Sequence, residues 1–515
     1  MRKRVEYGVL WVVLVLGLCI GSQHAGVSWD EVTYFDFSDH VRHWWSNGAP
    51  LDAAALDHAW AYDRYLNPHP PMMRAFSALT RAYSGLPFPT NYRLASLMLC
   101  AGLLTGMYAL LWPTLGSLGA AFALSTVIFQ PRVYGDVLNA TTDAPVALAF
   151  SVLCLLAWRS AEAAPDKRAW LRGSILLTYS VATAIKFTGF LAIVPVGLYF
   201  LWRRQWSNVV WSGLAVPVAL CFLILTSPDR WHHPITGVVE YITYPFTRDS
   251  TPIATQYFGA QYAFHLPWHY FDVMTALTVP IAVLVALPFL FLVTPPYRSL
   301  RTALLFPLGF WIVLVHLPNT PRHDGVRQFL AVMPLLGLLG TLVYLSLIER
   351  LCHKVPAARV YAWKSASLTA ASTAMLLSFL PWLRVPLSSY NAFAGGLPGA
   401  EAMGMETTYL LEVISPDFLS RMNAVLAPGD SILLVPSWPL LRRYQAEGLL
   451  RNDIRVVDNM GERPRFLLLV RRRSLVRDEL FLKLPALLEK SYDDVVLAKL
   501  SPNGQRETRG DHISE

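Results

Sequence analysis

Two adjacent carboxylates, Asp30 and Glu31, follow directly after an apolar run near residues 5–22. A carboxylate at the boundary between membrane and water can accept a proton from a hydroxyl group, or help to hold a divalent cation against a phosphate. The pair would also suit the solvated start of a helix. The spacing alone leaves both interpretations open.

A third carboxylate, Asp143, lies in the segment Asn139-Ala-Thr-Thr-Asp-Ala-Pro145, immediately before another apolar run. Pro145 fits the first turn of a helix, and Thr142 or Asp143 could cap that turn. Asp143 is therefore either a helix cap or a member of a site.

Basic side chains occur at two further membrane boundaries. Lys186 lies between two apolar pieces, where an ammonium group is costly unless it snorkels to water or meets an anion such as phosphate. Arg322, His323 and Arg327 lie together before a later apolar run. Arginine forks match two phosphate oxygens, although this could also be a charged loop in which Asp324 neutralises one arginine.

Histidines supply candidate ligands for phosphate or metal. In Asn67-Pro-His-Pro-Pro-Met72 the prolines fix the backbone around His69, so the segment is either a site element or a simple turn. The long loop 228–270 is rich in histidine and aromatic residues and contains His232. The candidate metal ligands are Glu31, His69 and His232.

The elements that must position these residues are membrane helices. Of the 515 residues, 54% are apolar or aromatic and only 15% are charged, against about a quarter charged in soluble domains. The net charge of +8 comes from scattered lysines and arginines, which argues against nucleic-acid binding.

Apolar runs long enough to cross a bilayer predict about eleven transmembrane helices. They lie near residues 5–22, 92–113, 115–131, 143–159, 169–186, 188–202, 207–227, 271–294, 302–317, 327–348 and 366–383. Lysine and arginine in alternate loops, including Arg2 to Arg4, place the N-terminus in the cytoplasm of a plasma (bacterial inner) membrane. The exported segments are then 23–91, 132–142, 228–270, 318–326 and everything after about 384, and nearly all the candidate site residues lie in these segments or at the ends of the adjoining spans.

The chain changes character after residue 384, where long apolar runs stop. Strands are predicted at 431–436, 453–457 and 466–470, with a helix at 440–450. We therefore expect a transmembrane core at 1–384 and a small extracytoplasmic α/β domain at 385–515, which contains no Gly-rich phosphate loop.

The order of the motifs resembles the C-type (GT-C) glycosyltransferases, in particular bacterial members of the protein O-mannosyltransferase class in glycosyltransferase family 39. The similar elements, in chain order, are Asp30-Glu31, His69-Pro-Pro, Arg93, Thr142-Asp-Ala-Pro, Lys186-Phe-Thr-Gly, Gln256-Tyr-Phe-Gly259, Leu266-Pro-Trp-His-Tyr270, Arg322–Arg327, Ser389–Gly396 and Met405–Tyr409. The resemblance covers about 450 residues and implies a GT-C fold.

The resemblance also implies roles for the residues. Asp30 would be the base toward the acceptor, with Glu31 beside it and Asp143 opposite as a further catalytic acid. The groups around the donor phosphate would be His69, Lys186, Arg322, His323 and Arg327. The resemblance implies no certain cofactor and leaves a divalent metal cation open, because relatives differ in metal use. Pro68-His69 stands where relatives carry Glu-Lys, which argues against metal ligation by that element.

The expected function is transfer of a sugar from a polyprenyl-phosphate donor to a hydroxyl of a protein, lipid or glycan on the extracytoplasmic face. Two other classes also fit a polytopic basic chain. One is a transporter or flippase for a lipid-linked sugar, which would usually place charges at mid-membrane in two repeated halves. The other is a non-catalytic envelope-assembly protein.

Overall fold

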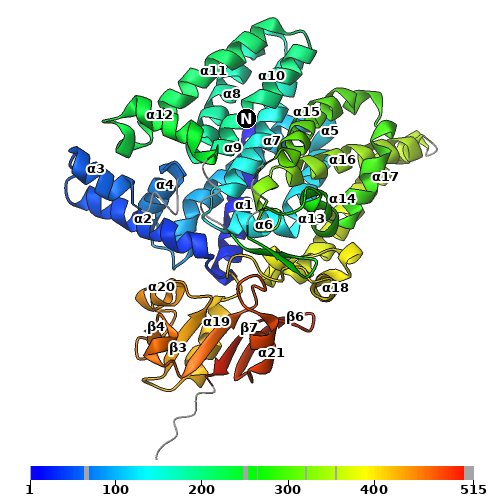
Figure 1. Ribbon diagram of the computed structural model, residues 1–515. Helices are drawn as coiled ribbons and strands as arrows, with labels where there is room; N and C mark the ends of the chain where they lie inside the picture. Colours follow the sequence, from blue (N-terminus) through cyan, green and yellow to red (C-terminus); the bar gives the residue numbers. More distant parts are fainter. Residues whose placement is uncertain are drawn as a thin grey trace, which may run out of the picture.

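The computed structural model describes residues 2–62, 69–246, 253–263, 265–318, 320, 322–353 and 356–503. Figure 1 shows a bundle of helices with a smaller sheet-containing region at one end. Asn67, Pro68, Asn319, Pro321, Lys354 and residues 504–515, which entered the sequence predictions, lie outside the described residues.

Helices occupy every apolar run predicted to cross the membrane. They are α1 (Arg2–His24), α5 (Thr90–Ile128), α7 (Asp143–Glu162), α8 (Pro165–Ile185), α9 (Phe187–Leu191), α10 (Ile193–Trp202), α11 (Trp206–Leu225), α13 (Tyr270–Thr278), α14 (Ile281–Ala286), α15 (Pro295–His316), α16 (Val332–Cys352) and α17 (Ala357–Phe379). In the described part of the chain, seven helices are long and apolar enough to cross a membrane, or eight if the bent pair formed by Tyr270–Thr278 and Ile281–Leu292 is one span. The chain is a multi-pass membrane protein.

Two of these spans are broken. The element α5 consists of two helices, as predicted at 92–113 and 115–131, which join at Gly116, where φ is +72°. Glycine has no Cβ and adopts this conformation without steric cost. The chain bends by 108° between Tyr270–Thr278 and Ile281–Leu292, at a break that includes Pro280.

Burial divides the spans into a centre and a periphery. In the most apolar 18-residue stretch of each span, 94% of the residues are buried in α7 and 83% in α16. The corresponding shares are 11% in α1 and 17% in the span that contains α17. In α1 the exposed side chains include Val5, Val9, Leu16 and Ile20, which suit contact with lipid. The helix that begins at Asp143 therefore lies in the middle of the bundle.

Shorter elements connect the spans along the chain. They are α2 (Trp29–Ser46), α3 (Ala53–Trp60), α4 (Met72–Tyr83), α6 (Pro131–Leu138), α12 (Pro234–Thr243) and the hairpin of β1 (Thr255–Tyr257) and β2 (Ala260–Tyr262). The hairpin was not predicted from the aromatic loop 228–270.

The C-terminal region, defined here as residues 385–503, contains a five-stranded sheet. The strands β3 (Ser431–Val435), β4 (Arg455–Val457) and β5 (Phe466–Val470) confirm the three predicted strands, and α20 (Leu440–Ala446) is shorter than the predicted helix. The sequence analysis missed β6 (Leu488–Tyr492) and β7 (Val495–Pro502), which complete the order β4-β3-β5-β7-β6. In β6 the burial pattern contains no fully buried position, so the strand lacks a clear apolar signal. The remaining helices are α18 (Gly396–Ala402), α19 (Pro416–Val425) and α21 (Asp478–Lys483).

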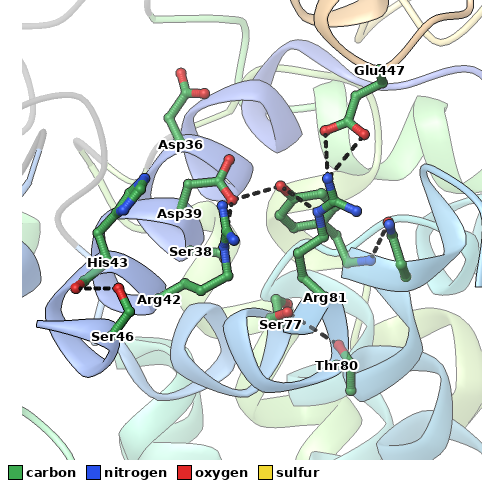
Figure 2. A network of polar contacts seen from close by, with 12 residues as sticks. Asp36, Ser38, Asp39, Arg42, His43, Ser46, Ser77, Thr80, Arg81 and Glu447 are labelled. Carbon is green, nitrogen blue, oxygen red and sulfur yellow. Dashed lines mark hydrogen bonds and ion pairs between the residues drawn. The ribbon is translucent and has the colours of Figure 1, made fainter. Parts of the chain in front are cut away.

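A polar network ties the C-terminal region to the bundle. Arg443 of α20 contacts Asp39 of α2 at 2.9 Å, and Arg81 of α4 contacts Glu447 at 3.3 Å. The hydroxyl of Tyr92 donates to Asp39 at 2.7 Å. Figure 2 shows Arg81 directed at Glu447, with Asp39 beside them. These contacts fix α2 and α4 against the C-terminal region.

Candidate functional site

Arg327 gathers three carboxylates that are far apart in the sequence. Its Nε atom lies 2.7 Å from Asp143 Oδ2, one Nη atom pairs with Asp30, and the other lies 3.8 Å from Asp324 Oδ2. The Arg327 side chain is only 9% exposed. We call Arg327 together with Asp30, Asp143, Lys186 and Asp324 the Arg327 cluster.

Asp143 occupies the first position of α7 and bridges two cations. One carboxylate oxygen binds Arg327, and the other pairs with Lys186, which lies in extended backbone between α8 and α9. Asp143 therefore satisfies the buried ammonium of Lys186, as a buried charge requires. With both oxygens held by cations, Asp143 is suited to position Arg327 and Lys186, and the geometry does not favour the proton-transfer role that the resemblance implied.

Asp30 is the most accessible carboxylate of the Arg327 cluster. It lies in the first turn of α2, and its side chain is 28% exposed, against 2% for Asp143 and 1% for Asp324. A capping box formed by Ser28 and Glu31 starts this helix, which fixes the direction of the Asp30 side chain. Asp30 is the carboxylate of the cluster that a hydroxyl substrate could reach.

Glu31, although adjacent to Asp30, points into a separate buried contact. Its two oxygens accept hydrogen bonds from Arg93 Nε and Nη2, each at 2.7 Å, and both side chains are fully buried. The backbone N–H groups of Ser28 and Ala140 also donate to this carboxylate, at 2.9 and 2.7 Å. The prediction that Glu31 shares in catalysis or holds a metal disagrees with this geometry, since its acceptor positions are occupied.

Arg322 does not join Arg327. Its guanidinium donates to the backbone carbonyls of Val315, Leu266 and Leu317 at 2.9, 3.2 and 3.1 Å. Backbone carbonyls near the end of α15 thus use the donors that the sequence analysis assigned to phosphate. The predicted role of Arg322 at the donor phosphate stays a prediction.

His323 lies next to Asp324 of the cluster, and His69 lies just before α4. His323 is buried, with its Nε2 atom 3.0 Å from Gln328 Nε2 and 4.0 Å from Asp324 Oδ2. His69 is half-buried before α4, and its carbonyl accepts a hydrogen bond from Arg74. Their predicted role at the donor phosphate stays a prediction.

The three candidate metal ligands do not converge. Among the residues that the structure describes, no group of three or more His, Cys, Asp or Glu side chains could hold a metal ion. His232 contacts the carbonyl of Leu51 at 3.2 Å, while Glu31 is held by Arg93. Glu31, His69 and His232 therefore do not fit a shared metal centre.

Sequence analysis missed Arg472, which reaches the cluster from the C-terminal region. Its Nη2 atom lies 2.8 Å from Asp324 Oδ1, and both side chains are 1% exposed. The run Arg471-Arg-Arg473 directly after an apolar strand was an available signal. Its partner lies 148 residues earlier, and nothing in the local sequence indicates that pairing.

Two buried carboxyl groups near Arg327, Asp136 and Asp324, have pKa values shifted in opposite directions. Burial raises the pKa of Asp136 in α6 to about 7, and Asp143 adds to this effect while Arg327 and Arg132 oppose it. Burial also acts to raise the pKa of Asp324, but the charges of Arg472, His323 and Arg327 outweigh it and lower that pKa. Asp324 is thus held as an anion, whereas Asp136 titrates near neutrality.

A cavity of about 640 Å³ lies outside the Arg327 cluster. It is lined by parts of α5, α16, α17 and the α13–α14 break, including Phe122, Ile281, Tyr344, Met375 and Tyr390. None of the predicted site residues lines it, and we therefore keep the candidate site at Arg327.

Comparison with known proteins gives a match in structure but none in sequence. No protein-family model and no curated protein matches the chain. The crystal structure of ArnT from Cupriavidus metallidurans in the apo state matches with a TM-score of 0.52 and 14% identity, covering 97% of this chain and 98% of that chain. The structure of the same protein bound to undecaprenyl phosphate matches with a TM-score of 0.52 and 13% identity over the same shares.

These likenesses define the class of fold. Nearly the whole of both chains superimposes, including the bundle and the C-terminal sheet. The protein is an α-helical multi-pass membrane protein with a GT-C fold and a small C-terminal α/β region, as the sequence predicted.

Proposed function

We propose that the protein is a membrane glycosyltransferase that moves a sugar from a polyprenyl-phosphate donor to a hydroxyl acceptor. The observation that carries the proposal is the Arg327 cluster, in which the accessible Asp30 carboxylate pairs with the buried Arg327 and Asp143 connects Arg327 to the buried Lys186. The GT-C fold supports it, and so does the bound undecaprenyl phosphate of the structural neighbour. The order of motifs favours a relation to the protein O-mannosyltransferase class.

The cluster can perform an inverting displacement. Asp30 removes the proton from the acceptor hydroxyl, and that oxygen forms a bond to the anomeric carbon of the sugar. The bond from this carbon to the phosphate oxygen breaks, and polyprenyl phosphate leaves with the electron pair. Arg327 and Lys186 stabilise the negative charge that develops on the leaving phosphate.

The ion pair between Arg327 and Asp30 implies that the donor phosphate binds before Asp30 acts as the base. While Arg327 is paired with Asp30, the guanidinium occupies the carboxylate and competes with an acceptor hydroxyl for it. A donor phosphate that binds Arg327 competes for its N–H groups and releases Asp30. Asp143 keeps Arg327 and Lys186 together during this exchange.

The location of the Arg327 cluster at the start of α7 supports chemistry at the extracytoplasmic face of the inner membrane. Asp143 and Arg159 lie near opposite ends of α7, about 24 Å apart at 1.5 Å per residue. Arg159 belongs to the basic loops that indicate the cytoplasmic side. We therefore infer that the Arg327 cluster and the C-terminal region face away from the cytoplasm of a bacterial inner membrane.

The test is Asp30→Asn, compared with Asp36→Asn in the same helix. Asp36 has a similarly exposed side chain, at 36% against 28%, and contacts Arg443 rather than Arg327. Membranes carrying equal amounts of each variant are incubated with labelled polyprenyl-phosphate sugars, and the label is followed into acceptors. We expect transfer by the wild type and Asp36→Asn but not by Asp30→Asn. Unimpaired transfer by Asp30→Asn would overturn the assignment of the base.

A second measurement separates the transferase from a transporter. In proteoliposomes a flippase moves labelled donor between leaflets and leaves the sugar on its carrier. We expect the label to leave the carrier. Movement of intact donor without cleavage would contradict the proposed reaction.

A further inference from the structure

The C-terminal region holds the residue immediately before Asp30. The Trp29 backbone N–H donates to the carbonyl of Leu410 at 2.8 Å, and its carbonyl accepts from Trp438 Nε1 at 2.9 Å. The guanidinium of Arg472 lies over the Trp29 ring, 4.1 Å from its centroid. Trp29 is therefore fixed at its backbone and at its ring face.

Arg472 also contacts the opposite side of the Arg327 cluster. It pairs with Asp324 Oδ1 at 2.8 Å, and the other oxygen of Asp324 faces Arg327 at 3.8 Å. Its Nη1 atom donates to the backbone carbonyl of Tyr409, and Nη2 donates to the carbonyl of Ala254 as well as to Asp324. One guanidinium thus links Trp29, which carries the base into place, with the carboxylate beside Arg327.

Asp324 lies in a tight turn that is packed against the C-terminal region. Asp324 has φ of +55° and Gly325 has φ of +68°, so two successive residues adopt the left-handed region. Aspartate tolerates this region better than most residues, and glycine adopts it freely. A Cβ at Gly325 would lie 3.2 Å from the Tyr409 ring, so the turn is closely packed against the C-terminal region.

The two neighbouring arginines show that Arg472 is distinct. Arg471 pairs with Glu401 and Asp478, and Arg473 pairs with Asp478 at 2.6 Å. Both therefore bind partners within the C-terminal region, whereas the ion pair of Arg472 crosses to Asp324. Burying a guanidinium costs free energy unless it is paired and hydrogen-bonded, so the position of Arg472 is tied to that of Asp324.

We propose that Arg472 is a positioning residue of the transferase site, and that the C-terminal region thereby forms part of that site. Arg472 orients Trp29, and through it Asp30, while it holds Asp324 against Arg327. The proposal rests on the proposed function for its catalytic meaning. The structural coupling can be measured without any substrate.

The first experiment compares Arg472→Met with Arg473→Met in the full chain in lipid nanodiscs. Hydrogen exchange is followed at residues 29–34 and 322–327. We expect Arg472→Met to speed exchange in both segments about tenfold, because local opening becomes easier, whereas Arg473→Met leaves both unchanged. Equal exchange in these segments for the two variants would overturn the proposal.

The second experiment measures transfer by the same variants, once the labelled donor is identified. We expect Arg472→Met to lower kcat about 30-fold with little change in the KM for donor, since misplacement of a catalytic group affects the transition state more than binding. Arg472→Lys should recover only part of kcat, because lysine keeps the charge but not the planar fork. Wild-type kcat in Arg472→Met would overturn the positioning role.

The two experiments separate the two proposals. If the wild type transfers no sugar but exchange still responds to Arg472→Met, the proposed function fails and the coupling stands. If transfer occurs and Arg472→Met changes neither exchange nor kcat, the positioning proposal fails alone.

Discussion

Two buried charge clusters flank one loop, and they differ in how completely their hydrogen bonds are used. Around Arg93, the guanidinium binds both oxygens of Glu31 and the carbonyls of Ser22, Ala25 and Gly26. Around Arg327, by contrast, the Asp30 carboxylate keeps an exposed edge. The loop before α7 serves both, through the N–H of Ala140 and the carboxylate of Asp143.

The difference assigns unlike roles to neighbours in the sequence. A fully paired buried carboxylate stabilises the fold but is inaccessible to substrate, and breaking such a pair leaves an uncompensated charge. A partly exposed carboxylate with one cationic partner contributes less to stability and can exchange that partner for a ligand. We therefore expect Asp30 to govern activity and Glu31 to govern stability.

The largest expected effect is on catalysis by Asp30→Asn. Removal of a general base should lower kcat/KM by a factor of about 100 to 10,000. Thermal unfolding in the same detergent should shift little, because the carboxylate is partly exposed. A large loss of thermal stability in Asp30→Asn would contradict the expectation that Asp30 governs activity and not stability.

Next in size is the loss of stability on Glu31→Gln. The substitution leaves Arg93 buried without its counter-charge, which we expect to cost about 3–5 kcal/mol in the free energy of unfolding. The shift in unfolding temperature, measured beside wild type and Asp30→Asn, checks this. If Glu31→Gln unfolds like the wild type yet loses transfer, Glu31 and not Asp30 would be the base.

A smaller effect is expected at the donor side of the Arg327 cluster. Lys186→Met removes one of the two cations proposed to face the phosphate, and we expect the KM for donor to rise about tenfold. Lys364→Met is the matched control, since Lys364 pairs with Glu349 at 3.5 Å away from the cluster. Equal KM values in the two variants would remove Lys186 from the phosphate site.

The smallest expected effect concerns pH and Asp136. Its pKa is raised to about 7 in the folded protein, against about 4 in an unfolded chain. Between these values the unfolded state has lost a proton that the folded state keeps, so stability falls as pH rises from about 4 to 7 and stays lower above that. Asp136→Asn should abolish this fall and unfold about 2–4 °C higher than wild type at pH 8.

The measurement for Asp136 is the unfolding temperature from pH 5 to pH 8. Asp453→Asn serves as control, because Asp453 is exposed and its pKa is lowered chiefly by a hydrogen bond from Arg451. A wild-type profile that matches the Asp136→Asn profile would show that Asp136 does not titrate in this range.

The sequence by itself determined the layout of the molecule. Apolar runs of membrane length became helices, because lipid leaves no other partner for backbone groups, and short apolar runs located β3, β4 and β5. The same runs placed Asp30, Asp143 and Lys186 at helix boundaries. These features depend on local periodicity, which a single sequence displays.

Tertiary structure decided which charges meet. Arg327 joins Asp143 across 184 positions, and Arg93 joins Glu31 across 62, while Arg322 binds only nearby carbonyls and the carbonyl of Leu266. Asp30 and Glu31 differ by one position on α2, and this rotation around the helix axis sends one to the accessible cluster and the other into the core. Such choices depend on which distant side chain fills each neighbouring space, and that information resides in the packed structure.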